Sequence, residues 1–149
     1  MVIGGSGLVG GLVLDRLAAS GRRDVQAVLR RPVPVRDGLE QVIAPPSDWP
    51  ERIARLEPQV LIVTLGTTIR QAGSQGAFRA VDHDLVLEAA AAARLADAVH
   101  CIAISAVGAS VHSRTFYLRT KGEVEQGLRR LAFPRLDLLR PGLLLGARA

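Results

Sequence analysis

Short apolar runs alternate with segments of helical periodicity along the whole chain. Each apolar run is followed by turn residues or by a helix start, which is typical of parallel strands joined by crossover helices. We expect six strands, at residues 1–3, 25–29, 41–44, 60–65, 100–105 and 136–139. We expect helices at 7–19, 49–56 and 74–95, and a fourth that carries Tyr117 and ends near residue 131. This order predicts an α/β fold, with a doubly wound parallel sheet and helices on both of its faces.

The composition narrows the class of protein further. The chain has 149 residues, 48% of them hydrophobic, so we expect one domain over residues 1–149. The net charge is +5, but the arginines are dispersed and only 3% of residues are aromatic, which argues against a nucleic-acid partner. No apolar stretch approaches the ~20 residues that span a bilayer, so we expect no membrane partner.

A single cysteine, Cys101, lies in an apolar run, where we expect a buried structural thiol. One cysteine cannot form an internal disulfide, and the chain does not begin with a secretion signal. Both features predict a cytoplasmic location.

The remaining candidate ligands of a metal are scattered. His83, His100 and His112 do not have the spacing of a metal site, so we expect none. We place Asp82, with His83 and Asp84, on the exposed side of the 74–95 helix and give it no catalytic role.

A glycine-rich loop follows the first expected strand and opens the first expected helix. Gly4 permits a tight turn, Gly7 lets a pyrophosphate approach backbone N–H groups, and Gly10 lets the helix pack close to the sheet. A glycine turn with a purely structural role is the alternative. The context favours a dinucleotide-binding loop made of Gly4, Ser6, Gly7, Leu8, Val9 and Gly10.

Two arginines, Arg30 and Arg31, end the second expected strand, 20 residues past Gly10. An NAD-binding domain would place an acid there to bind the ribose 2′-hydroxyl. A guanidinium instead pairs with a 2′-phosphate, so we predict that NADP(H) is preferred over NAD(H). The alternative is a pair of solvated arginines in an arginine-rich chain.

The only tyrosine and the only lysine, Tyr117 and Lys121, stand four residues apart. In a helix this spacing places both on one face, where an ammonium stabilises a phenolate. Ser105 ends the fifth expected strand, at the edge where parallel sheets bind ligands. We predict that Ser105 holds a substrate oxygen, that Tyr117 transfers a proton, and that Lys121 supports Tyr117 and binds the nicotinamide ribose. Ser110 is the alternative for the serine.

Together these motifs resemble the short-chain dehydrogenase/reductase superfamily and, more narrowly, its atypical branch of Tat-interacting-protein-like NAD(P)-binding oxidoreductases. The resemblance covers nearly the whole chain, and it implies a Rossmann-type cofactor domain. It rests on residues 4–10, 65–68, 72–74, 78–82, Ser105 with 108–109, 117–123 and 140–142.

The resemblance also implies two further cofactor segments. It places a turn after the fourth strand beside the ribose, and a loop after the last strand beside the nicotinamide. Read without the family, these segments are a strand-end turn and a strand terminator. Their residues are Leu65, Gly66 and Thr67, and Pro141, Gly142 and Leu143.

We therefore predict an NAD(P)-dependent oxidoreductase that transfers hydride at a carbonyl or carbinol, or an epimerase- or dehydratase-like relative, with an unidentified small-molecule substrate. The alternative is an NADP(H)-binding regulatory or redox-sensing module with little turnover. Because both ends of the chain are abrupt, we expect a C-terminal substrate-covering segment to be missing. Apolar helical positions at Leu85, Leu87 and residues 91–93 favour a homodimer.

Overall fold

A six-stranded sheet, parallel throughout, forms the centre of the computed structural model, which describes residues 1–142. The spatial order is β3-β2-β1-β4-β5-β6, so the direction of winding reverses between β1 and β4. This confirms the predicted α/β, doubly wound class. The strands are β1 (Val2–Ile3), β2 (Val25–Leu29), β3 (Leu39–Ile43), β4 (Val60–Val63), β5 (His100–Ile104) and β6 (Arg135–Leu139).

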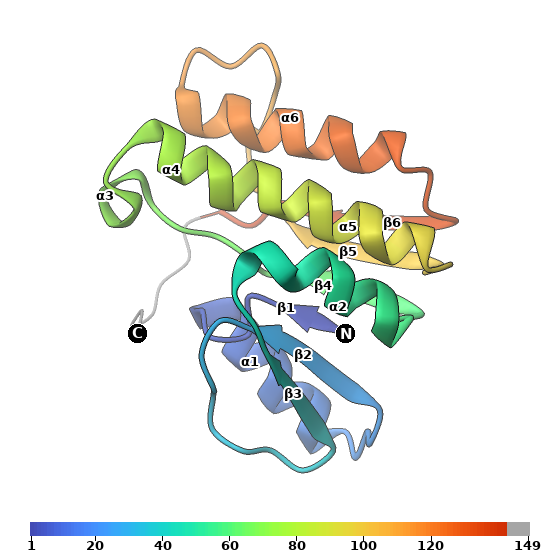
Figure 1. The fold of residues 1–149 in the computed structure, drawn as a ribbon. Coiled ribbons are helices and arrows are strands. Elements are labelled where there is room, and N and C mark those ends of the chain that lie inside the picture. The colour runs from blue at the N-terminus through green and yellow to red at the C-terminus, as the bar shows by residue number, and fades with distance from the viewer. Residues whose placement is uncertain (143–149) are drawn as a thin grey trace.

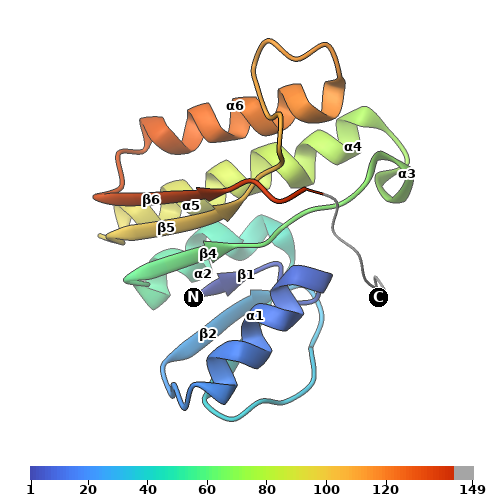
Figure 2. The ribbon, with the colours of Figure 1, turned by 180° about the vertical axis from the view of Figure 1, so that it is seen from behind.

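Helices cover both faces of the sheet, as predicted. One face carries α1, and the other carries α2, α5 and α6 (Figure 1, Figure 2). Within residues 1–142, no helix combines the length and the apolar character that a bilayer crossing requires. The helical elements are α1 (Leu8–Ala19), η1 (Pro46–Asp48), α2 (Trp49–Leu56), α3 (Ile69–Ala72), α4 (Gln75–Arg79), η2 (Ala80–Leu85), α5 (Val86–Leu95) and α6 (Phe116–Arg130).

The helix expected at 74–95 contains an irregularity. It begins where the Ser74 hydroxyl accepts a hydrogen bond from Ala77 N, and it widens into a π-helical segment, η2, before α5. A short helix that was not predicted, α3, precedes it. The Thr68 hydroxyl caps α3, and Gly73, with a φ of 85°, ends it.

The larger core lies between the sheet and the α2, α5 and α6 layer. Alanines such as Ala89 and Ala93 are fully buried there and let α5 approach the strands closely. Leu85 and Ala93, which we expected at a subunit interface, belong to this core instead.

Cys101 is also buried in the larger core, as predicted, and burial raises the pKa of its thiol to about 12. The thiol is therefore inert at neutral pH. A smaller core under α1 includes Val2 and Leu14.

Candidate cofactor and proton-transfer site

The glycine loop lies where the winding of the sheet reverses. Gly4 has a φ of 84°, and Gly7 donates a backbone hydrogen bond to the Gly4 carbonyl at 3.0 Å. Gly7 then caps α1 without any side-chain hydrogen bond. The first N–H groups of α1 therefore have no side-chain cap, which is the arrangement that binds phosphate at a helix N-terminus.

Gly10 sets how closely α1 approaches the loop and β4. A Cβ at this position would lie 2.2 Å from the Gly4 carbonyl oxygen and 2.6 Å from Thr64 Oγ1. That hydroxyl is itself fixed, because it donates to the Ile3 carbonyl at 2.8 Å. Neither neighbour is a flexible side-chain end, so only glycine fits.

We expect Gly10→Ala to lower the free energy of unfolding by about 1–3 kcal/mol, because the added methyl group overpacks a rigid contact. Gly11→Ala is the matched control, because a Cβ there meets nothing closer than 3.9 Å. Alanine also favours a helix, so Gly11→Ala should be neutral or stabilising. Urea denaturation of both variants measures the difference, and equal stability would contradict the packing account.

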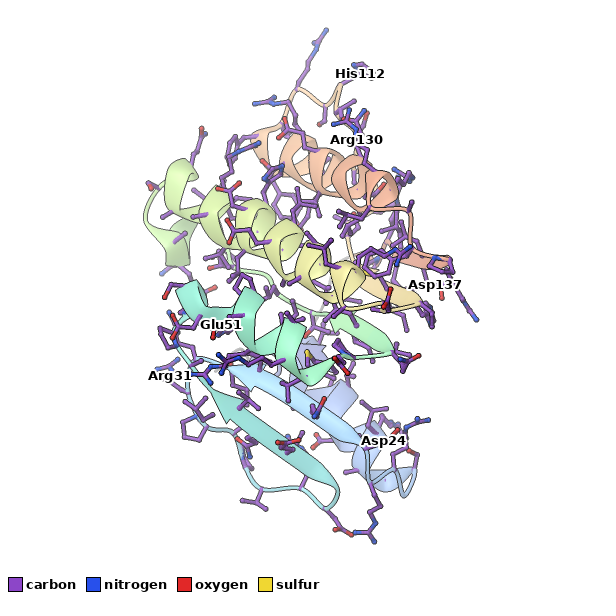
Figure 3. All side chains as sticks on the ribbon, turned by 45° about the vertical axis from the view of Figure 1, so that its right-hand side comes forward. Asp24, Arg31, Glu51, His112, Arg130 and Asp137 are labelled. Atoms are coloured by element: carbon purple, nitrogen blue, oxygen red, sulfur yellow. The ribbon has the colours of Figure 1, made fainter. Side chains whose placement is uncertain are left out.

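Arg30 and Arg31 lie just past β2 at its carboxyl end, and both are exposed. Figure 3 labels Arg31 at this end of the strand. Among residues 1–142, neither arginine forms a salt bridge, whereas Arg36 pairs with Asp15 at 2.7 Å. Both guanidinium groups are therefore available to an anion at the edge of the sheet where α1 begins.

A buried ion pair joins α6 to η2. Lys121 Nζ donates to Asp82 Oδ1 at 2.8 Å, and the two side chains are only 7% and 1% exposed. The other carboxylate oxygen of Asp82 accepts a hydrogen bond from the Thr67 backbone N–H at 2.8 Å. Asp82 therefore fixes both the lysine and the turn that follows β4. Within the described chain, two of the three Lys121 donors have no partner.

The burial of Asp82 corrects its expected exposure. On the same helical segment Phe78 and Leu85 are buried together with Asp82, while Val81 is only half-buried. Asp82 lies four residues after Phe78, and this spacing was a signal for a shared face. Its partner is 39 residues away, which no local pattern reveals.

Tyr117 stands in the first turn of α6, one turn before Lys121. It is 38% exposed, and its ring packs against Phe78 with ring centres 5.8 Å apart. In the described part of the chain its hydroxyl has no hydrogen-bond partner. The tyrosine is therefore held by its ring and offers its hydroxyl to solvent or to a ligand.

Ser105 follows β5, and its hydroxyl donates to Glu125 Oε1 at 2.6 Å. Among residues 1–142 it makes no hydrogen bond to Tyr117 or Lys121. Ser110, the alternative serine, accepts from the His112 backbone N–H at 3.2 Å. The structure therefore brings Ser105 to α6, but at a position one turn beyond Lys121.

The carboxylate of Glu125 is buried, and none of the predicted roles falls on this residue. Burial raises its pKa, but hydrogen bonds from Arg140 and Ser105, with support from Arg129, outweigh this and leave the pKa below its usual range. Arg140 follows β6 and binds both oxygens of the carboxylate. The signal in the sequence was the spacing, because Tyr117, Lys121 and Glu125 recur every four residues along α6.

The last predicted cofactor segment is described in part. Pro141 lies beside the end of β5, since Val107 N donates to its carbonyl at 3.1 Å. Gly142 is exposed, with no atom close to the position of a Cβ. Leu143 lies outside the described residues.

Comparison with known proteins identifies the family. No protein-family model matches the chain. "Protein FMP52, mitochondrial" from Eremothecium gossypii is 38% identical over 151 residues, which cover 99% of this chain and 67% of that relative. The chain belongs to the FMP52 family. The relative of the same name in Saccharomyces cerevisiae is 36% identical over 153 residues, with 99% of this chain and 66% of the relative covered.

The names of the FMP52 relatives correct two expectations. They carry the word mitochondrial in several fungi, so the predicted cytoplasmic location is wrong. They also bear the FMP52 name, and not that of the Tat-interacting-protein-like oxidoreductases that the motifs resemble.

Solved structures share the fold of this FMP52-family chain at low sequence identity. A short-chain dehydrogenase/reductase superfamily protein from Agrobacterium tumefaciens with bound NAD has a TM-score of 0.78 and 18% identity, over 93% of this chain and 47% of that one. UDP-glucose 4-epimerase from Thermotoga maritima with UDP-glucose has a TM-score of 0.74 and 17% identity, over 93% and 53%. The chain therefore has a Rossmann-type fold and spans about half the length of these enzymes.

Proposed function

We propose that this chain binds a nicotinamide dinucleotide and transfers hydride at a carbonyl or carbinol carbon, or acts as an epimerase- or dehydratase-like relative of such enzymes. The observation that carries the proposal is the buried Lys121–Asp82 pair, one helical turn from Tyr117, which is 38% exposed. A buried charge that retains unused donors is a feature of functional sites. Its partner Asp82 lies in a π-helical segment, which is a frequent feature of such sites.

The residues present fit the dinucleotide. The glycine loop and the uncapped start of α1 would hold the pyrophosphate, and Gly66 and Thr67 would pass beside a ribose. When bound, the nicotinamide supplies or accepts the hydride. The fold of the NAD-bound Agrobacterium tumefaciens protein supports this assignment.

The chain's own residues then handle the proton and the oxygen. Tyr117 would donate its phenolic proton to a carbonyl oxygen during reduction and take it back from the alcohol during oxidation. Lys121 would stabilise the phenolate and bind the ribose through its two remaining donors. Ser105 would contact a hydrogen-bond donor such as the hydroxyl of an alcohol substrate, because its own proton goes to Glu125.

A turnover assay tests this function. NADPH absorbance is followed with a panel of aldehydes and ketones, and oxidation of NADPH with any of them supports the proposal. Nucleotide sugars are tested by chromatography of the products, because an epimerase or dehydratase returns the hydride and leaves the cofactor unchanged. Binding of NADPH without turnover on the whole panel would favour the regulatory alternative described below.

We propose that NADP(H) is preferred over NAD(H), because Arg30 and Arg31 stand exposed without salt bridges in the described chain. The double variant Arg30→Ala/Arg31→Ala should weaken NADPH binding by about 10- to 100-fold, as expected for the loss of charge-assisted hydrogen bonds to a phosphate. NADH binding should change little. Calorimetric titration with each cofactor measures both affinities.

The arginine pair at the other end of β2 provides the control. Arg22 and Arg23 precede β2, at the opposite end of the strand, and pair with Asp24 and Asp37. The double variant Arg22→Ala/Arg23→Ala removes the same charge from the molecule, but it should not change the affinity for NADPH relative to that for NADH. If the two double variants lose NADPH affinity equally, the 2′-phosphate assignment is wrong.

A second candidate function is an NADP(H)-binding regulatory or redox-sensing module with little turnover. The specific observation in its favour is that Asp82 compensates the charge of Lys121 at 2.8 Å. A compensated ammonium stabilises a nearby phenolate less than a free one does. The two candidates share the cofactor and differ in the rate of the chemical step.

We also propose that the FMP52 family falls within the atypical branch of the short-chain dehydrogenase/reductase superfamily. The glycine loop and the stretch from Tyr117 to Glu123 support this placement. The names of the relatives support a mitochondrial location for this chain as well.

A further inference from the structure

The Glu125 carboxylate is the most fully hydrogen-bonded acidic group in the described chain. Its side chain is 2% exposed, and each oxygen accepts two hydrogen bonds. Oε1 accepts from Ser105 Oγ at 2.6 Å and from Arg140 Nε at 2.7 Å. Oε2 accepts from a second Arg140 nitrogen and from Arg129 at 3.2 Å. A single buried group therefore collects four donors.

These donors come from three different elements. Ser105 directly follows β5, Arg140 directly follows β6, and Arg129 lies on α6, as does the acceptor Glu125. The backbone continues the pairing past the strands, because Ser105 N donates to the Leu139 carbonyl at 2.7 Å. Glu125 thus fastens the carboxyl ends of two neighbouring strands to the helix that carries Tyr117.

The Glu125 cluster lies at the β5 and β6 end of the strand order, whereas the glycine loop lies at β1. The loop follows β1, and β5 and β6 lie beyond β4 in the strand order (Figure 1). A dinucleotide that crosses the carboxyl edge at the reversal point would place its adenosine half toward β2 and its nicotinamide half toward β5. The Glu125 cluster therefore lies on the nicotinamide side.

The direction of the Ser105 hydrogen bond limits what this serine can do. A hydroxyl has one proton, and here that proton goes to Glu125. Only the lone pairs of Ser105 Oγ remain for a ligand. A group that contacts this oxygen must therefore be a donor, such as a hydroxyl or the amide N–H₂ of a carboxamide.

We propose that Glu125 is a positioning residue for the nicotinamide half of the site. It holds Ser105 as a hydrogen-bond acceptor, and through Arg140 it holds the adjacent residue Pro141. This inference rests on the proposed function, because it requires a nicotinamide cofactor at this edge. Removing Glu125 should then weaken the contacts with the nicotinamide half and spare those with the adenosine half.

Two ligands separate the halves of the site. NADPH contains both halves, whereas adenosine 2′,5′-bisphosphate lacks the nicotinamide. By calorimetric titration, Glu125→Gln should weaken NADPH binding about tenfold, the equivalent of one good hydrogen bond, and should leave the bisphosphate affinity unchanged. Glu123→Gln is the matched control, because Glu123 lies on the same helix and pairs with Arg79, with both side chains half-buried. It should change neither affinity.

Ser105→Ala provides a second readout that does not require the loss of a buried charge. Ser105→Ala removes the hydrogen-bond acceptor, so it should also weaken NADPH binding and leave the affinity for the bisphosphate unchanged. The double variant Ser105→Ala/Glu125→Gln should lose less NADPH binding free energy than the sum of the two single losses. If Glu125→Gln does not fold, the selective loss in Ser105→Ala supports the proposal, and its absence overturns it.

The remaining outcomes are distinct. Equal loss of both ligands, or loss of thermal stability with an unchanged ratio of the two affinities, would show that Glu125 is merely structural and would overturn the inference alone. If the wild-type protein binds neither of these ligands and does not bind NADH, the proposed function fails, and the inference falls with it.

Discussion

Replacing Tyr117 with phenylalanine is expected to lower kcat for carbonyl reduction by roughly 10²- to 10⁴-fold, the usual contribution of general acid catalysis. The affinity for NADPH should not change. Phenylalanine keeps the ring that packs against Phe78 and removes only the hydroxyl, which has no hydrogen-bond partner in the described chain. The substitution therefore removes the proton donor without disturbing the fold. Steady-state kinetics and calorimetry on the same preparations separate the two effects.

Phe116→Leu serves as a control for the Tyr117 variant. Phe116 is the neighbouring residue of the same helical turn, and its ring also packs against Phe78, with ring centres 5.8 Å apart. Its loss perturbs the packing but removes no proton donor, so kcat should fall far less. A Tyr117→Phe enzyme with wild-type kcat would exclude Tyr117 from the chemical step.

Replacing Asp82 with asparagine should lower the free energy of unfolding by roughly 3–5 kcal/mol, because it leaves the Lys121 ammonium buried without a counter-charge. Both side chains of the Lys121–Asp82 pair are buried, and the Asp82 carboxylate also accepts a hydrogen bond from the Thr67 backbone N–H. Chemical denaturation measures the loss. Turnover should fall as well, since the Lys121 ammonium would no longer be held in place by the Asp82 carboxylate.

Two further variants test the buried pair. Asp84→Asn changes an exposed carboxylate two residues away and should alter stability by about 0.5 kcal/mol or less. The double variant Asp82→Leu/Lys121→Met removes both charges and should recover much of the stability lost in Asp82→Asn, since apolar pairs often replace buried ion pairs well. Equal stability of Asp82→Asn and Asp84→Asn would show that the pair contributes little.

The elements that local periodicity determines were predicted well. The bounds of β2 and α2 agree with the expected residues 25–29 and 49–56, because strand and helix periodicity and the flanking turn residues are local signals. β4 and β5 end one or two residues earlier than expected. The next backbone groups still bond to the sheet, since Thr64 N donates to Ile3 and Ser105 N donates to Leu139.

The long-range polar contacts of the site could not be predicted. Asp82 was expected in solvent because it is charged, yet its partner Lys121 and the π-helical segment together bury it. Glu125 and Arg140 are brought together only by the docking of α6 against β6. Such pairings depend on how the layers pack, and a single sequence carries no direct record of this.

The spacing of Tyr117 and Lys121 correctly predicted that both residues lie on one helix. Both residues lie on α6, one turn apart, and the glycine loop lies at the start of α1 as expected. The roles assigned to Ser105, Tyr117 and Lys121 stay predictions. The structure adds to them a partner for the lysine and a partner for the serine.

The measurement that tests the central claim most directly is a calorimetric titration of the chain with NADPH, repeated with NADH. The account predicts saturable binding of NADPH in a one-to-one ratio, with weaker binding of NADH, because the glycine loop and the exposed pair Arg30 and Arg31 act on the same dinucleotide. Binding of neither cofactor would contradict it, and both the enzyme and the regulatory proposals would then fall.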